Sequence, residues 1–276
     1  MGNGCLSNGW SIISSASTNS QLAGVLAGFI FTGVTISLGR PGSRNARALE
    51  LLCAAFVVLG FDSYLFSLVA GGNADPICAR VWSEGMPASG MLAVGGLSVV
   101  TAITWMLAGR TSPHEDASPA DDRDNSMISL DRLARFMAHG VAVAVTLLLA
   151  STTFSYLLVV YPHHILPELG WSVGLSPLVV GSASIVLSWY RSKNPTSKLT
   201  SRISTVSLKA ASYEILAYAV LGPVFAGYVD TVTVIDWRKS LGLLATSALL
   251  FGLYIPSLLL IALVQAIAPA ERAKSG

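Results

Sequence analysis

The chain has 276 residues, of which 53% are apolar and only 12% are charged, and its net charge is +2. About 25% of the residues in a soluble globular domain are charged, so this composition excludes an ordinary soluble domain. The 17 basic residues are dispersed along the chain and form no basic patch, so we expect no nucleic-acid partner.

Long apolar segments recur along the chain and determine its fold class. A helix of about 20 apolar residues crosses a hydrocarbon layer about 30 Å thick. Lipid offers the backbone no hydrogen-bond partners, which favours helices, and the short alternating strands of a barrel are missing. The sequence therefore predicts an all-α, polytopic membrane protein, a single domain over residues 1–276, with about seven transmembrane helices at residues 21–38, 49–70, 86–108, 133–160, 171–190, 213–229 and 241–268.

The distribution of Lys and Arg predicts the orientation. The segments after the first, third and fifth helices, the start of the fourth helix and the C-terminal tail together hold 14 of the 17 basic residues. Basic residues accumulate on the cytoplasmic side of a membrane. We therefore expect an N-terminus outside, a C-terminus in the cytoplasm and a location in the cytoplasmic (plasma) membrane.

Two of the three cysteines, Cys5 and Cys78, lie on the outer side in this topology, while Cys53 falls within the second helix. An oxidising exterior permits a disulfide between the outer pair. Two unpaired thiols are the alternative.

Asp62 is the outstanding candidate for a functional residue. It falls about 13 positions into the second predicted helix, near the bilayer midplane, where an ionised carboxylate costs several kcal/mol. Together with the adjacent Ser63, it is a candidate site for a proton, an ion or a ligand. The alternative is a protonated carboxyl group that bonds to another helix and has a structural role.

Residues 109–126 contain no large apolar side chain, so we expect a disordered cytoplasmic linker there. After it, His139 lies near the cytoplasmic end of the fourth helix and is a further candidate, because histidine titrates near neutral pH. An interfacial histidine without a function is the alternative.

Residues 191–209 form a predicted cytoplasmic loop with five basic and no acidic residues. Cations near an anionic leaflet are attracted to its headgroups. We therefore expect membrane lipid as a partner, contacted by Arg191, Lys193, Lys198, Arg202 and Lys209.

Prolines fall near the middle of the last two predicted helices, in the pair Gly222 and Pro223 and at Pro256. Proline lacks a backbone donor, and interrupted helices can line a binding cavity at the midplane. We therefore include these residues in the candidate site. Ordinary kinks are the alternative.

The sequence carries no motif for ATP hydrolysis or for the common protease and lipase chemistries, and we expect no catalytic residue, metal or cofactor. The leading hypothesis is a transporter or channel-like protein for a small solute or ion, coupled to protons through an Asp62 that faces the last two helices. The second hypothesis is a non-catalytic sensor, immunity or assembly component. The third is a lipid-modifying enzyme.

Overall fold

The computed structural model describes residues 5–7, 10–38, 43–72, 78–110, 121–161, 167–193, 198–232 and 234–267. In this part of the chain, six helices are long and apolar enough to cross a membrane: Ile12–Leu38, Ala46–Gly71, Cys78–Leu107, Leu133–Val160, Val206–Thr231 and Gly242–Ala266. The predicted all-α, polytopic membrane fold is confirmed.

The elements follow one another along the chain with short connections. A two-stranded antiparallel pair comes first, and helices make up the rest. Their order is β1 (Leu6–Ser7), β2 (Trp10–Ser11), α1 (Ile12–Leu38), α2 (Ser43–Gly71), α3 (Cys78–Arg110), α4 (Asp121–Val160), α5 (Pro167–Lys193), α6 (Lys198–Thr231), α7 (Val234–Leu249), a π-helical turn η1 (Leu250–Tyr254) and α8 (Ile255–Ala266).

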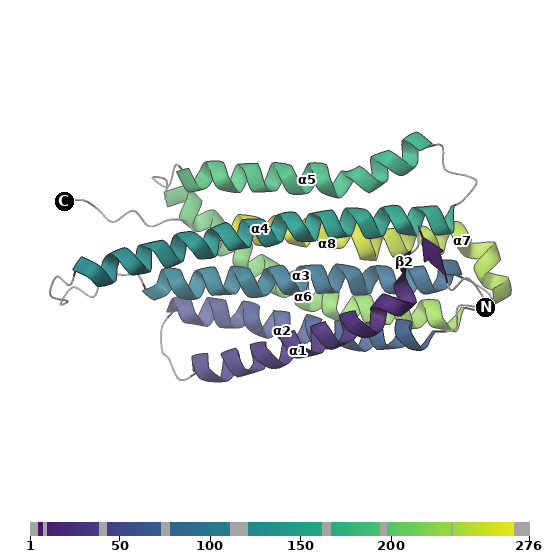
Figure 1. Cartoon of the computed structure of the whole chain (residues 1–276), viewed down its shortest axis with the longest axis horizontal. Helices are drawn as coiled ribbons and strands as arrows, with labels where there is room; N and C mark the ends of the chain where they lie inside the picture. The colour runs from purple at the N-terminus through teal and green to yellow at the C-terminus, as the bar shows by residue number, and fades with distance from the viewer. Residues whose placement is uncertain are drawn as a thin grey trace.

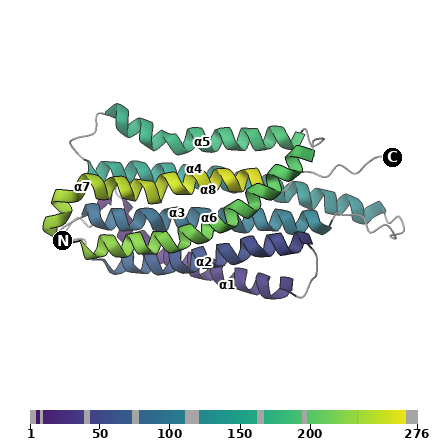
Figure 2. The same cartoon turned by 180° about the vertical axis from the view of Figure 1, so that it is seen from behind.

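The long helices lie side by side along one axis (Figures 1 and 2). Consecutive helices pack against each other from α1 to α5, and α6 returns to pack on α2 and α3. Helix α5 lies at the edge of the bundle, and its main contacts are with α4 and α8. The two strands and α7 lie at one end, and α8 runs toward the other.

The outer surface of the bundle is apolar, as lipid requires. Phe29, Leu148 and Val224 expose 72%, 64% and 63% of their surface, and they belong to three different helices. Large apolar side chains exposed in such numbers over several helices would aggregate in water. The chain is therefore an integral, multi-pass membrane protein.

Helix α5 decides whether the number of crossings is six or seven. It has 27 residues, but its described apolar portion is only Leu175–Ser188. The count of seven and the orientation therefore remain predictions.

Two helices extend further into polar sequence than the hydropathy pattern indicates. Helix α4 begins at Asp121, so residues 121–126 of the predicted linker are helical. Most of the predicted loop 191–209 is also helical, in α5 and α6. Hydropathy reports only the part of a helix in lipid, and extending a helix that has already been nucleated costs little. Residues 111–120 and 194–197 lie outside the described residues.

Helix α3 occupies the centre of the bundle, and its glycines allow neighbouring helices to approach closely. A Cβ atom on Gly95 would lie 2.6 Å from Cδ2 of Leu59 in α2, and a Cβ atom on Gly85 would overlap Cδ1 of Ile12 in α1. Small residues are typical of such contacts between transmembrane helices. The close approach fixes the positions of α1 and α2 around α3.

Candidate functional site

Asp62 lies on the inward face of α2. Buried side chains recur at helical spacing on both sides of it, including Ala55, Leu59, Phe66 and Val69. This face packs against α3 and α6. Asp62 itself has 0% exposure, so the helix places a carboxyl group inside the bundle and away from lipid.

Neither carboxyl oxygen of Asp62 has a hydrogen-bond partner among the described residues. Most buried polar groups in proteins are hydrogen-bonded, and an isolated buried charge is far more costly than an isolated neutral group. The carboxyl group is therefore neutral in the described conformation. A neutral carboxyl group holds one proton, which the site can release when its surroundings become polar.

Tyr218 connects α6 to two other elements of the bundle. It lies on the buried face of α6 with 2% exposure. The Tyr218 hydroxyl donates to the main-chain oxygen of Phe251 at 2.6 Å and lies 3.1 Å from that of Pro87. One side chain of α6 thus connects α3 and η1.

The π-helical turn η1 explains why the Phe251 oxygen needs an outside donor. The N–H of Ile255 donates to the oxygen of Leu250, five residues earlier. In a π-helix each N–H bonds to the main-chain oxygen five residues earlier, so the oxygen of Phe251 would be paired with the nitrogen of Pro256. Proline has no N–H to donate. Tyr218 supplies the missing donor, because an unpaired carbonyl in a membrane interior is costly.

The two predicted helix interruptions have different outcomes. Pro256 lies two residues after the end of the π-helical turn, so the last span is irregular where the sequence indicates. Gly222 and Pro223 lie inside helix α6, which continues through them, and their place in a candidate site stays a prediction. Membrane helices tolerate proline because neighbouring groups support the freed backbone. A Cβ atom on Gly222 would lie 2.9 Å from Sδ of Met91, so this glycine allows close packing on α3.

Ser63 is directed away from Asp62 and connects α2 to α1. Its hydroxyl group donates to the main-chain oxygen of Ser20 at 2.9 Å, and the Ser20 hydroxyl donates to the main-chain oxygen of Ser63 at 2.8 Å. Successive helical residues point about 100° apart, so adjacent residues contact different neighbours. The structure therefore separates Ser63 from the site of Asp62.

His139 also lies apart from Asp62, in a chain of polar contacts between α4, α5 and α8. Its Nδ1 atom lies 2.7 Å from the main-chain oxygen of Arg135, and its Nε2 atom lies 3.3 Å from the Ser188 hydroxyl. Ser188 in turn donates to the main-chain oxygen of Val264 at 3.2 Å. These contacts give His139 a role in joining three helices.

A small crevice opens between the same three helices. Its lining includes Thr146 of α4, Pro177 and Gly181 of α5, and Ser257 of α8, and it does not include Asp62. The Ser257 hydroxyl is buried and has no hydrogen-bond partner in the part of the chain that the structure describes. The crevice and the buried carboxyl group are thus separate features of the bundle.

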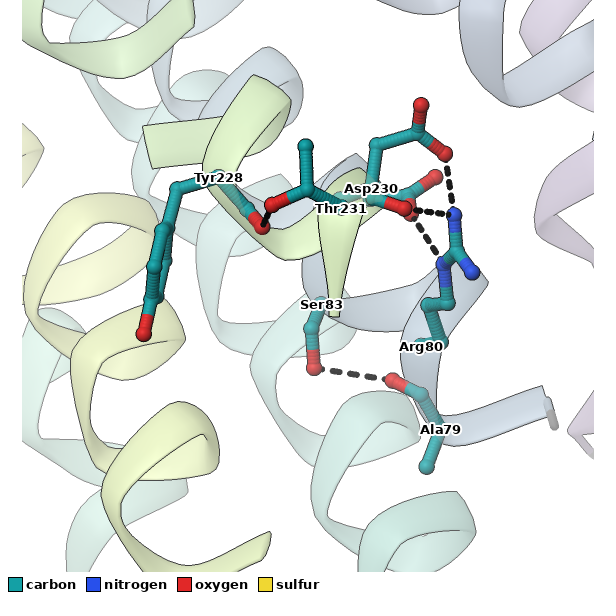
Figure 3. A network of polar contacts seen from close by, with 7 residues as sticks. Ala79, Arg80, Ser83, Tyr228, Asp230 and Thr231 are labelled. Atoms are coloured by element: carbon teal, nitrogen blue, oxygen red, sulfur yellow. Dashed lines mark hydrogen bonds and ion pairs between the residues drawn. The ribbon is translucent and has the colours of Figure 1, made fainter. Parts of the chain in front are cut away.

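A polar network at one end of the bundle fastens α3 to α6 (Figure 3). Arg80 of α3 donates from Nε to Oε1 of Glu84 at 2.9 Å, and from Nη2 to the main-chain oxygen of Asp230 at 2.6 Å. It also forms an ion pair with the Asp230 carboxylate. Cations interact favourably with the last carbonyls of a helix, and α6 ends at Thr231. A neighbouring residue of α3, Ser83, contacts the Tyr156 hydroxyl of α4 at 3.1 Å.

The N-terminal strands are attached to the same end of α3. Of the two alternatives left open by the sequence, the structure has the disulfide, with 2.09 Å between the Sγ atoms of Cys5 and Cys78. The Nε1 atom of Trp82 donates to the main-chain oxygen of Cys5 at 3.2 Å. The rings of Trp10 and Trp82 meet edge to face, with centroids 5.3 Å apart.

The basic residues predicted to contact lipid are divided by the structure. Lys209 is exposed on α6, as headgroup contact requires. The side chains of Arg191, Lys193, Lys198 and Arg202 lie outside the described residues, although their backbones are helical. The lipid contact remains a prediction.

The sequence analysis missed Tyr218 and the network around Arg80. The relevant signal for Tyr218 was Pro256, because a proline inside a span always leaves a carbonyl that needs another donor. The sequence does not say that the donor comes from a helix about 40 residues earlier, at Tyr218. For Arg80, helix packing alone brings the end of α6 beside it.

The chain matches no family model, and it has no significant similarity to the curated proteins or to the solved structures with which it was compared.

Proposed function

We propose that the chain is a transporter of a small solute or ion in the cell membrane, coupled to protons through Asp62. The observation that carries the proposal is the complete burial of both Asp62 carboxyl oxygens without a hydrogen-bond partner among the described residues. Ionisable residues inside membrane spans typically mark ion pathways and proton relays. A purely structural carboxyl group would be expected to have a partner.

The proton fits this site better than a metal cation does. A hard cation such as Ca²⁺ is held by about six or more oxygen ligands. In the described part of the chain, no three His, Cys, Asp or Glu side chains lie close enough together to hold a metal ion. A single carboxyl group among apolar side chains can hold a proton without further ligands, so the coupling ion is H⁺.

On this proposal, the described conformation is the occluded state of the transport cycle. Asp62 has no exposed surface, and it must reach water on each side in turn to exchange its proton. The irregular backbone of the last span provides flexibility for that change. The π-helical turn η1 interrupts this span two residues before Pro256, and π-helical turns frequently occur at functional sites.

The test compares Asp62→Asn with wild-type protein in liposomes. Asparagine retains the size of the side chain but does not titrate. We expect the wild type to take up at least one member of a broad solute panel when a proton gradient is imposed, and to move protons with it, measured with a pH-sensitive dye. Asp62→Asn should insert normally and lose this proton-coupled flux.

Glu50→Gln is the matched control, because Glu50 is an exposed carboxylate on the same helix. It should retain the flux of the wild type. Wild-type flux in Asp62→Asn would remove Asp62 from the coupling mechanism. A wild-type protein that moves no solute in the panel would support a non-catalytic membrane component instead.

A further inference from the structure

We propose that His139 is a second proton-binding site of the bundle, and that its charged form fastens α5 to the end of α8. The site lies apart from Asp62 and does not depend on a transport function. Its ligand is a proton, which the imidazole ring takes up. The number of hydrogens available to the polar contacts that join α4, α5 and α8 requires this proton.

Both ring nitrogens of His139 lie beside groups that accept hydrogen bonds. Nδ1 lies 2.7 Å from the main-chain oxygen of Arg135, and a carbonyl oxygen has no hydrogen to donate, so Nδ1 must carry one. Nε2 lies 3.3 Å from the Ser188 hydroxyl. This hydroxyl already donates its single hydrogen to the main-chain oxygen of Val264 at 3.2 Å, so Nε2 must donate as well. All three hydrogen bonds form together only when the ring has both protons.

Loss of one proton from the ring reverses the Ser188 hydroxyl. Nδ1 keeps its hydrogen, because a lone pair there would face the main-chain oxygen of Arg135. Nε2 then becomes an acceptor, and the Ser188 hydroxyl rotates to donate to it. The bond between α4 and α5 remains with its direction reversed, while the bond between α5 and α8 is lost.

The end of α8 favours the charged form of the ring. Helix α8 ends at Ala266, and the last four carbonyls of a helix receive no N–H from within it. The oxygen of Val264 is one of these four, and its backbone donor is the N–H of Ile267 at the long distance of 3.4 Å. A cation near the C-terminal end of a helix is stabilised by these carbonyls. The helix end that accepts the Ser188 hydrogen thus also stabilises the charge on the ring.

The described charges around the ring are few. Arg135, one turn earlier on α4, is a like charge, and like charges at this spacing are only mildly unfavourable. Helix α8 has no ionisable residue, and the described ionisable side chains of α3 are Arg80 and Glu84, at the opposite end of the bundle. Tyr190 of α5 and Tyr254 of η1 are exposed. The side chains of residues 121–132, Arg191 and Lys193 lie outside the described ones.

The contact between Ser188 and Val264 borders the crevice between α4, α5 and α8. Along α5 the lining ends at Ile185, and along α8 it ends at Val264, so Ser188 closes the crevice at one end. Helix α5 lies at the edge of the bundle and packs mainly on α4 and α8. Loss of the bond to α8 therefore loosens α5 on one of its two packed sides, beside the crevice.

Nitrogen NMR of the full chain in lipid nanodiscs counts the protons on the ring. With isotope-labelled histidine and the substitutions His114→Gln, His163→Gln and His164→Gln, the ring signals come from His139 alone. In a titration from about pH 4 to about pH 9, we expect a ring with two protons at the acid end. At the alkaline end, the remaining hydrogen should be on Nδ1. A neutral ring with its hydrogen on Nε2, or a ring that never has two protons, would overturn the proposal.

Backbone hydrogen exchange at residues 262–267, corrected for its intrinsic pH dependence, measures the bond to α8. In the wild type, exchange should increase severalfold over the pH range in which the ring loses its proton. His139→Gln should show no such step, because an amide N–H can donate to Ser188 at every pH. Ser188→Ala should exchange rapidly at every pH while the ring still titrates.

Ser182→Ala is the matched control, because Ser182 is exposed on α5 and its hydroxyl donates to the main-chain oxygen of Val179 in the same helix at 3.0 Å. It should show the pH step of the wild type, and so should Asp62→Asn. A step that persists in His139→Gln, or one that disappears in Asp62→Asn, would assign the proton to another group and reject His139. If His139→Gln does not fold, the comparison of Ser188→Ala with Ser182→Ala decides.

Discussion

The guanidinium group of Arg80 in α3 lies 2.6 Å from the main-chain oxygen of Asp230, next to the last residue of α6. The same group pairs with Glu84, whose side chain is only 12% exposed. Arg80 therefore stabilises a helix end and a largely buried carboxylate together. The Asp230 carboxylate is different, because its side chain is 70% exposed.

Arg80→Ala should destabilise the protein more than Asp230→Ala does. Loss of Arg80 leaves Glu84 without its cation and the end of α6 without a donor, and we expect a cost of about 2–3 kcal/mol. Asp230→Ala retains the main-chain contact and removes an exposed ion pair worth about 1 kcal/mol or less. Thermal unfolding in detergent measures the loss of stability in each variant. Equal effects of the two variants would contradict the role of the main-chain contact.

The disulfide between Cys5 and Cys78 should stabilise the end of the bundle at which the N-terminal strands lie. It joins residues 73 positions apart, and a disulfide typically contributes about 2–4 kcal/mol. Cys5→Ser should lower the midpoint of thermal unfolding and expose Trp82 to quenchers. Cys53→Ser is the control, since Cys53 is a free thiol. Mass spectrometry without reductant should find the linked peptide, and quantitative labelling of both outer thiols would exclude it.

Gly90→Ala and Gly96→Ala form a matched pair on α3. The new methyl group at position 90 overlaps the Tyr218 hydroxyl and Pro256, whereas nothing lies within 4 Å of a Cβ atom at position 96. Overpacking should cost about 1–3 kcal/mol at position 90. Gly96→Ala should be neutral or stabilise the helix by up to about 1 kcal/mol. The midpoints of thermal unfolding of the two variants test this difference. An unchanged midpoint in Gly90→Ala would show that α3 packs less closely on Tyr218 and Pro256 than the structure indicates.

Asp62→Leu should make the protein more stable. An unpartnered buried polar group costs about 1–3 kcal/mol, and leucine removes it without leaving a partner unpaired. A gain in stability with a loss of function is typical of residues kept for activity. The unfolding midpoint should therefore rise in Asp62→Leu. A clear decrease would indicate that the carboxyl group has a structural partner.

Reporter fusions after Gly109, Tyr161 and Lys193 test the orientation and the crossing by α5. With 14 of the 17 basic residues assigned to the cytoplasmic side, the fusions at Gly109 and Lys193 should report cytoplasm and the fusion at Tyr161 the exterior. If Tyr161 and Lys193 report the same side, α5 does not span and the number of crossings is six. A Gly109 fusion outside would reverse the orientation.

Local composition along the chain is enough to predict a helical membrane protein. Apolar segments long enough to cross a bilayer are expected to be helical, because the backbone in lipid must form its own hydrogen bonds. It also identified Asp62, since a carboxyl group inside an apolar segment is costly wherever the helix is placed. Both conclusions depend on local composition and on the solvent, which a sequence reveals directly.

Only the tertiary structure decided what surrounds Asp62. Helix rotation separates it from Ser63, and neither of its carboxyl oxygens meets a hydrogen-bond partner among the described residues. The backbone around two prolines differs because their surroundings differ. Pro223 lies in a continuous helix. Pro256 follows a π-helical turn in which the oxygen of Phe251 accepts a hydrogen bond from a side chain of α6. These outcomes depend on contacts between residues far apart in the chain, and local pattern does not encode which helix supplies a missing hydrogen bond.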